Sequence, residues 1–154
     1  MNFEKYTSIE NSYREKYIDK IKMSGFGGED SIYHVQEKIH GANLGIYCEN
    51  GEVEFASRNI KLTLDDKFYE LDSIELDLAA KILNLEYILS KAGTGVNGFV
   101  VYGELFGGIY PHPDVPVGNV SNVQSGVFYS PEKHFIAFDL SMLMQTLSFG
   151  TEVE

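Results

Sequence analysis

The sequence predicts an α+β domain, with a largely antiparallel sheet and helices at its periphery. Asn50-Gly51 lies between two segments of strand-like alternation, and an Asn-Gly pair supplies the positive φ values that a tight hairpin needs. Two other segments, near residues 9–23 and 73–91, carry apolar residues at helical spacing. Strands joined in hairpins, with helices outside them, are typical of α+β folds.

Length and composition favour one compact, folded domain. The chain has 154 residues, 44% of them hydrophobic, with ten Phe and ten Tyr. No apolar run approaches a membrane span, and residues 1–6 lack the basic and then apolar layout of a signal peptide. Cys48 is the single cysteine, which fits a reducing compartment, and we expect the cytoplasm. No Cys/His cluster has zinc spacing.

The charge balance is acidic, with 23 Asp and Glu against 12 Lys and Arg and a net charge of -11. Proteins that hold phosphate backbones normally meet them with lysine and arginine. Carboxylates can instead supply magnesium ligands, but most of them are expected on a solvated surface. If the chain acts on RNA, the basic residues that bind the RNA must be clustered locally or be supplied by another domain or protein.

A first helix is expected from about Ile9 to Met23, ending near Gly25. It follows a capping-box pattern at residues 7–10. Tyr13 and Tyr17 begin its apolar stripe, which favours core packing over a base-stacking platform.

A second helix is expected over residues 73–91, with Ser73 as its N-cap and the Gly93-Thr94-Gly95 segment as its end. Its apolar stripe is structural and consists of Ile74, Leu78, Ile82, Leu85, Ile88 and Leu89.

Short apolar and alternating segments predict the strands of the sheet. They lie at about residues 32–38, 43–49, 53–57, 99–105 and 135–140. Residues 60–72 are polar and acidic and are expected to form a loop. Residues 109–126 hold three of the four prolines and predict a long ordered loop, which in a compact domain is often functional.

Lys38 is expected at the end of the first strand, just before a tight turn that contains Gly41. A lysine with small neighbours can approach a phosphate closely and act as a covalent nucleophile, provided that its amine is neutral. A free lysine has a pKa of about 10.4, so burial or a neighbouring cation must lower it. The alternative is a hairpin with a solvated lysine.

Four ordered segments resemble the motifs of the covalent nucleotidyltransferases, in the form used by the RNA ligase 2 family and its kinetoplastid RNA-editing ligases. Residues 38–43, Lys-Ile-His-Gly-Ala-Asn, resemble motif I, and His40 stands where DNA ligases and capping enzymes usually carry aspartate. The other three are residues 55–59, with the arginine that follows motif I, 101–108 as motif III, and 135–140 as motif IIIa. Two further segments, 110–113 and 126–131, also look like editing-ligase sequence.

The resemblance implies an ATP-dependent RNA ligase that seals 5′-phosphate and 3′-hydroxyl RNA ends through lysyl-AMP, with ATP and Mg²⁺ as cofactors. It implies Lys38 as the nucleophile toward the α-phosphate of ATP. His40 would support adenylation, and Asp139 would serve a later step. His40 has an ordinary alternative, in which it satisfies backbone groups of the turn.

Six further residues are implied in nucleotide binding. Glu37 and Ile39 would flank the adenine, Asn43 would orient the phosphate, Arg58 would hold the sugar and phosphate region, Glu104 would accept a ribose hydroxyl, and Phe138 would stack on the adenine. Four of these residues have an alternative: a turn contact for Asn43, an ion pair between Arg58 and Glu104, and core packing for Phe138.

The family pattern stops after Leu140, where fourteen residues remain. Motif IV, with a glutamate near the metal, and motif V, with two lysines, are absent from residues 1–154. We therefore expect a single, incomplete adenylyltransferase domain with an uncovered sheet edge, patched by an apolar tail of Met142, Leu143, Met144, Leu147 and Phe149. The alternative is a non-catalytic nucleotide-binding remnant, or one half of a split ligase that acts with a partner subunit. A capping-type or DNA-ligase relative ranks lower.

Overall fold

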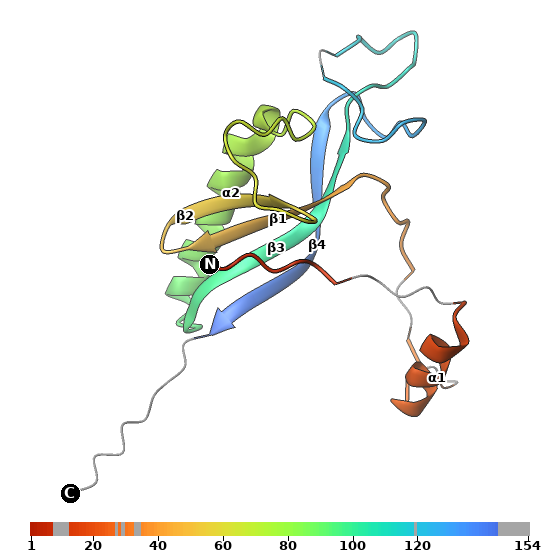
Figure 1. Cartoon of the computed structure of the whole chain (residues 1–154), viewed down its shortest axis with the longest axis vertical. Helices are drawn as coiled ribbons and strands as arrows, with labels where there is room; N and C mark the ends of the chain where they lie inside the picture. The colour runs from red at the N-terminus through yellow and green to blue at the C-terminus, as the bar shows by residue number, and fades with distance from the viewer. Residues whose placement is uncertain (8–12, 27, 29, 33–34, 119, 145–154) are drawn as a thin grey trace, which may run out of the picture. The chain divides into compact units, whose positions relative to one another are not determined.

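The structure, a computed structural model, describes residues 1–7, 13–26, 28, 30–32, 35–118 and 120–144. The chain forms two compact units (Figure 1). The larger unit comprises Met1–Lys5 and Ile39–Glu154, and the smaller comprises Tyr6–Lys38.

The larger unit is built on an antiparallel sheet. Its four strands are β1 (Ala42–Glu49), β2 (Glu52–Ser57), β3 (Val96–Gly107) and β4 (Lys133–Met144). They lie in the order β2-β1-β3-β4, and all three pairings are antiparallel (Figure 1). Asn50 and Gly51 join β1 to β2 with φ values of 53° and 78°, as the hairpin prediction required. The α+β class is thus confirmed.

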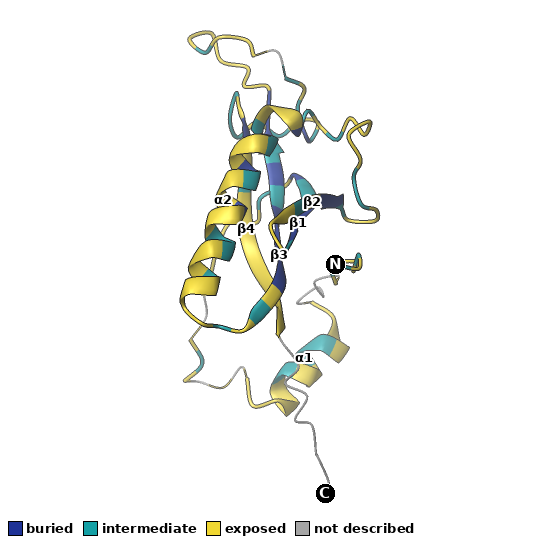
Figure 2. Cartoon of the chain, turned by 90° about the vertical axis from the view of Figure 1, so that its left-hand side faces the viewer, coloured by how far each residue is buried: buried dark blue, intermediate teal, exposed yellow. Residues whose placement is uncertain are grey.

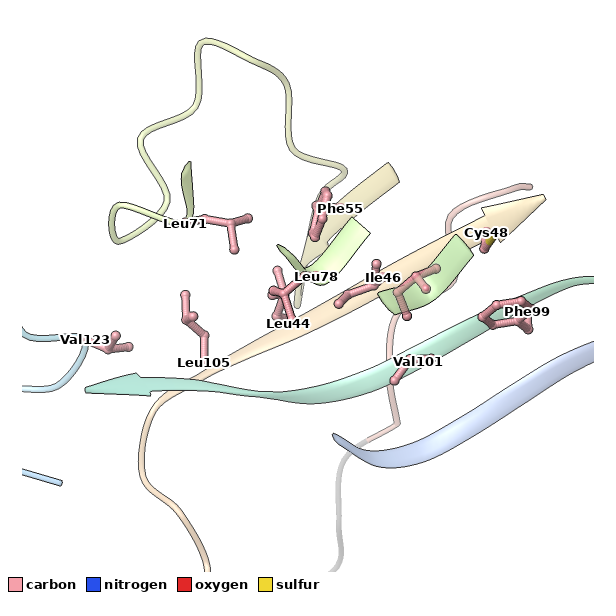
Figure 3. Packing of buried hydrophobic residues seen from close by; sticks show 11 residues of the cluster. Leu44, Ile46, Cys48, Phe55, Leu71, Leu78, Phe99, Val101, Leu105 and Val123 are labelled. Atoms are coloured by element: carbon pink, nitrogen blue, oxygen red, sulfur yellow. The ribbon is translucent and has the colours of Figure 1, made fainter. Parts of the chain in front are cut away.

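Helix α2 (Asp72–Lys91) covers one face of the sheet and closes the hydrophobic core. Alternate residues of the strands point toward it, because successive side chains of a strand leave opposite faces. Leu44, Ile46 and Cys48 of β1 are fully buried there, and Cys48 lies beside its register partner Phe99 of β3 (Figure 3). The outer side of α2 is exposed, as Figure 2 shows. Burying a large apolar side chain stabilises a fold by roughly 1.5–3 kcal/mol.

The start of α2 differs from the expectation. The helix begins at Asp72, and no side chain caps it, so Ser73 is not its N-cap. The Ser73 hydroxyl instead donates to the carbonyl of Glu70 at 2.8 Å. Of the predicted apolar stripe, Leu78 and Ile82 are buried in the core, but Ile88 is 52% exposed and lies outside it.

Strands β3 and β4 are each longer than expected, because each extends the hydrogen-bonded ladder of the other. They pair from Gly107 opposite Lys133 to Val96 opposite Met144. Met142, Leu143 and Met144 therefore belong to the edge strand itself and do not form a tail that patches it. Leu147 and Phe149 lie outside the described residues.

The smaller unit contains helix α1 (Glu15–Met23), whose N-cap position is Arg14. Tyr13 precedes this helix, and the remainder of its expected start at residues 8–12 lies outside the described residues. The helix ends as predicted, with Gly25 at φ 79°. None of its residues is buried, so the predicted core packing of the tyrosine stripe is wrong.

The predicted strand at residues 32–38 is also wrong. Residues 32 and 35–38 have no regular secondary structure, whereas 33–34 lie outside the described residues. None of the three strand pairings includes these residues, and a strand without a partner cannot satisfy its backbone groups.

Candidate functional site

The sheet face opposite α2 carries polar side chains from three neighbouring strands. Asn43 of β1 is the register partner of Glu104 of β3, and Tyr102 of β3 is the partner of Asp139 of β4. Residues directly opposite each other in a sheet share a face. Asn43 and Glu104 also alternate with the buried Leu44 and Leu105, which point into the core (Figure 3). The register therefore brings Asn43, Glu104 and Asp139 onto one face.

Gly41 forms a turn that lies against the end of β3. Its backbone N–H donates to Oε1 of Glu104 at 3.1 Å. A Cβ atom at this position would lie 2.0 Å from the carbonyl oxygen of Leu105. Only glycine permits this close approach of two backbones. Glu104 thus fixes the position of the turn that follows Lys38-Ile39.

Two side chains from the segment between β3 and β4 contact the same turn. The N–H of His40 donates to the Tyr129 hydroxyl at 3.1 Å, and Nε2 of Gln124 donates to the carbonyl of Gly41 at 2.8 Å. Neither Gln124 nor Tyr129 is a predicted site residue. In the sequence, the long loop and the editing-ligase-like segment 126–131 could have drawn attention to these two residues. No rule of sequence spacing, however, predicts that either segment contacts the His40–Gly41 turn.

A bulge in β4 sets the position of Phe138. The pairing passes from Asp139 opposite Tyr102 to Ala137 opposite Gly103, so Phe138 is the extra residue of the bulged strand. Bulges bend a strand and redirect side chains, and they are common next to active sites. Phe138 is 48% exposed, which does not fit the alternative of a core residue.

The sheet environment near Asp139 also affects Tyr102. Burial raises the pKa of the Tyr102 hydroxyl, and a hydrogen bond with Tyr47 and the charges of Glu4 and Asp139 raise it further. The hydroxyl therefore stays protonated at neutral pH and can donate a hydrogen bond.

The remaining predicted site residues are divided between the two units. Arg58 follows the last residue of β2 and is exposed. Ile39 is the first residue of this part of the larger unit and is partly buried, whereas Glu37 and Lys38 are exposed and end the smaller unit. Lys38 is thus joined to the anchored His40–Gly41 turn through Ile39 alone.

Within the described ranges, no three His, Cys, Asp or Glu side chains come close enough together to hold a metal ion. Mg²⁺ in nucleotide sites is commonly held by one or two carboxylates together with phosphate oxygens and water. Among the described helices, none is long and apolar enough to cross a membrane.

Comparison with known proteins gives a consistent result. Residues 31–149 match the family model described as RNA ligase. The chain is 34% identical over 154 residues to "RNA-editing ligase 2, mitochondrial" of Trypanosoma brucei brucei. The aligned region covers 90% of this chain and 36% of that protein. The chain is 32% identical over 153 residues to "RNA-editing ligase 1, mitochondrial" of the same organism, covering 82% and 31%. The chain spans about a third of the length of these curated relatives.

Proposed function

The chain belongs to the RNA ligase family, and from that premise we propose that it carries the adenylation region of an ATP-dependent RNA ligase. Such an enzyme seals a 5′-phosphate to a 3′-hydroxyl through lysyl-AMP. The observation that carries the proposal is the His40–Gly41 turn. It follows Lys38-Ile39 in the chain and is anchored to Glu104 on the polar face of the sheet.

In the first step, Nζ of Lys38 attacks the α-phosphorus of ATP. A P–N bond forms, the bond from the α-phosphorus to the bridging oxygen breaks, pyrophosphate leaves, and the amine loses a proton. The 5′-phosphate of RNA then displaces the lysine to form RNA-adenylate, and the 3′-hydroxyl displaces AMP. Covalent catalysis of this kind divides a difficult transfer into easier steps.

Glu104 has two tasks in this proposal. Its Oε1 accepts the hydrogen bond of the Gly41 amide at 3.1 Å. A carboxylate has a second oxygen, which accepts a hydrogen bond from a ribose hydroxyl. One side chain then sets the distance between the sugar and the turn that follows the nucleophile.

The adenosine is placed on the polar face of the sheet. Phe138 stacks on the adenine with its exposed ring, and Asn43, the neighbour of Glu104, orients the phosphate. The other proposed roles follow the family motifs: Glu37 and Ile39 flank the adenine, Arg58 holds the sugar and phosphate region, His40 supports adenylation, and Asp139 serves a later step.

Membership of the RNA ligase family implies use of ATP. The Glu104 carboxylate, on the polar face, fits the ribose of that nucleotide, and the exposed ring of Phe138 fits its base. For Mg²⁺ we propose binding together with the triphosphate, since no three-residue ligand group occurs among the described residues. When bound there, the ion neutralises phosphate charge.

We further propose that residues 1–154 belong to one adenylation domain whose motifs IV and V lie on another segment or chain. The alternative is one half of a split ligase, and strand β4 fits both arrangements. Most of this edge strand is exposed, as its colour in Figure 2 shows. Its exposed large apolar residues are Ile136, Phe138, Leu140, Met142, Leu143 and Met144. Such an edge is a template for pairing with another strand.

The proposed compartment is reducing, in keeping with the lone, buried Cys48. The cytoplasm remains our proposal. Mitochondria are the alternative, since both trypanosome relatives are named mitochondrial. Fractionation of cells that express the tagged natural protein distinguishes the two.

The decisive experiment is an intact mass spectrum after incubation with ATP and Mg²⁺. Wild type is expected to gain one AMP, whereas Lys38→Ala and Lys38→Arg gain none. Lys38→Arg is the matched control, because it keeps the positive charge but stays protonated. An equal adduct on Lys38→Ala would refute the assignment of the nucleophile.

Two further comparisons separate the alternatives. Adduct with ATP but not GTP, and transfer to nicked RNA but not nicked DNA, support an RNA ligase over a capping-type or DNA-ligase relative. Calorimetric binding of ATP or AMP without any covalent product indicates a nucleotide-binding remnant.

A further inference from the structure

The segment between β3 and β4 holds the backbone of the His40–Gly41 turn. Tyr129 accepts from the N–H of His40 at 3.1 Å, and Gln124 donates to the carbonyl of Gly41 at 2.8 Å. Glu104 accepts from the N–H of Gly41 at 3.1 Å. Three backbone groups within two residues thus have side-chain partners from far along the chain.

Gln124 is held in place by its neighbours. Val123 is buried and points into the core (Figure 3), and its N–H donates to the carbonyl of Gly107 at 3.2 Å. The side-chain amide of Asn122 donates to the carbonyl of Val127 at 2.9 Å and closes the local loop. The Gln124 amide is therefore presented from a packed segment that is tied to the end of β3.

Tyr129 is positioned by ring packing. Its ring meets Phe106 of β3 edge-on, with centroids 5.7 Å apart and planes at 84°. Phe106 also packs against the ring of His134 at 5.6 Å, and His134 shares a 2.8 Å hydrogen bond with Ser130. An edge-on aromatic pair restricts ring orientation, so the Tyr129 hydroxyl has a defined place.

The base of the segment is tied down by a buried lysine. Nζ of Lys133, whose side chain is fully buried, lies 3.5 Å from Oε2 of Glu70 and donates to the carbonyl of Ser121. The Ser121 hydroxyl donates to the same Glu70 oxygen at 2.7 Å. This cluster connects the loop before α2, the segment that carries Gln124, and the start of β4.

We propose that Gln124 and Tyr129 are positioning residues for lysine adenylation, which act by holding the backbone of the turn that follows the nucleophile. The inference rests on the function proposed above. Lys38 lies two residues before His40, so a shift of the turn moves the attachment point of the nucleophile. A misplacement of about 1 Å can slow a reaction by about 100-fold. Gln124 and Tyr129 act through the backbone and need no contact with the nucleotide.

The test measures the single-turnover rate of AMP adduct formation by the full chain at saturating ATP and Mg²⁺. Tyr129→Phe and Gln124→Leu, which remove the bonding groups but keep most of the volume, are expected to slow the rate by about 10- to 100-fold. Thermal midpoint and the ATP concentration at half-maximal rate should stay near wild type. Tyr110→Phe is the matched control, because it makes the same change at an exposed tyrosine of the same segment, and it should react like wild type.

Amide hydrogen exchange at His40 supplies a readout that does not need activity. Tyr129→Phe should speed exchange at that amide, whereas Tyr110→Phe should not. Wild-type rates of adduct formation in Tyr129→Phe and Gln124→Leu would overturn this inference alone. Slower adduct formation that is matched by a lowered thermal midpoint and unchanged His40 exchange would also overturn it, in favour of a general structural role. No adduct on wild type would refute the proposed function together with this inference.

Discussion

The two faces of the sheet differ in what their side chains do, although the same strands supply both. Toward α2, β1 presents Leu44 and Ile46, which are fully buried. On the opposite face, the intervening positions present Asn43, which pairs with Glu104 of β3. Alternation along a strand therefore places the core and the candidate site one residue apart.

Because of this difference, the residues that stabilise the fold and the residues proposed to act on the nucleotide lie on different faces of the sheet. Substitutions toward α2 remove packed apolar volume and should affect folding first. Substitutions of Asn43 and Glu104, which are partly exposed on the opposite face, should affect nucleotide chemistry and leave folding nearly intact. Substitutions on the two faces test this separation, and the largest effect is expected in the core.

Ile46→Ala is expected to lower the free energy of unfolding by about 2–5 kcal/mol, because it removes a fully buried side chain and leaves a cavity. Urea denaturation measures the change. Asn43→Ala, on the opposite face of the same strand, is the control and should cost less than about 1 kcal/mol. Equal losses from the two variants would show that the faces are not separable.

Gly41→Ala is expected to destabilise the larger unit by roughly 1–3 kcal/mol, since the new Cβ would lie 2.0 Å from the Leu105 carbonyl oxygen. It should also abolish adduct formation, because the turn must move away from Glu104. Gly28→Ala is the control, since a Cβ there meets nothing within 4 Å. Adduct formation by Gly41→Ala at the wild-type rate would contradict the close approach of the two backbones.

The buried thiol of Cys48 makes the stability of the core depend on alkaline pH. Burial, with the neighbouring Glu86 as a second cause, raises the pKa of the Cys48 thiol from 9.0 to about 12. As the pH rises, the thiol of the unfolded chain ionises before that of the folded chain. The stability that the buried thiol contributes is therefore complete below pH 9 and is lost as the pH rises toward 12. The expected loss is about 1 kcal/mol between pH 9 and pH 10.

Urea denaturation at both pH values measures this loss, with Cys48→Ala as the reference for all other titrating groups. If wild type and Cys48→Ala show the same pH dependence, the thiol is accessible to solvent and the core at that end of β1 is open.

Glu70 gives the smallest effect, because its side chain is 43% exposed. The hydrogen bond from Ser121, followed by the charge of Lys133, holds the pKa of the Glu70 carboxyl below its usual 4.5. The stability that the ionised Glu70 carboxylate contributes is therefore complete above pH 4.5 and is lost as the pH falls below that value. Faster hydrogen exchange at the Ser121 amide between pH 4.5 and pH 3, beyond the intrinsic pH effect, is expected in wild type and absent in Glu70→Gln.

Local features of the fold could be predicted because they depend on neighbours in sequence. Asn50-Gly51 needed only its own backbone preferences to form the hairpin, and Gly25 needed only its own to end α1. The expected strand at 32–38 failed for the opposite reason, since a strand exists only where another pairs with it. The true extent of β4 likewise depends on the length of β3, its only pairing partner in the described sheet.

By itself, the sequence determined the α+β class, the family and the ordered set of residues that carries the proposed chemistry, because hairpin turns, alternation and short motifs are local. Only the tertiary structure decided that Glu104 binds the backbone of Gly41, that Phe138 lies in a bulge, and that Gln124 and Tyr129 hold the turn. These contacts join residues up to 89 positions apart. They depend on strand register and on loop packing, which arise only when the whole sheet closes over its core.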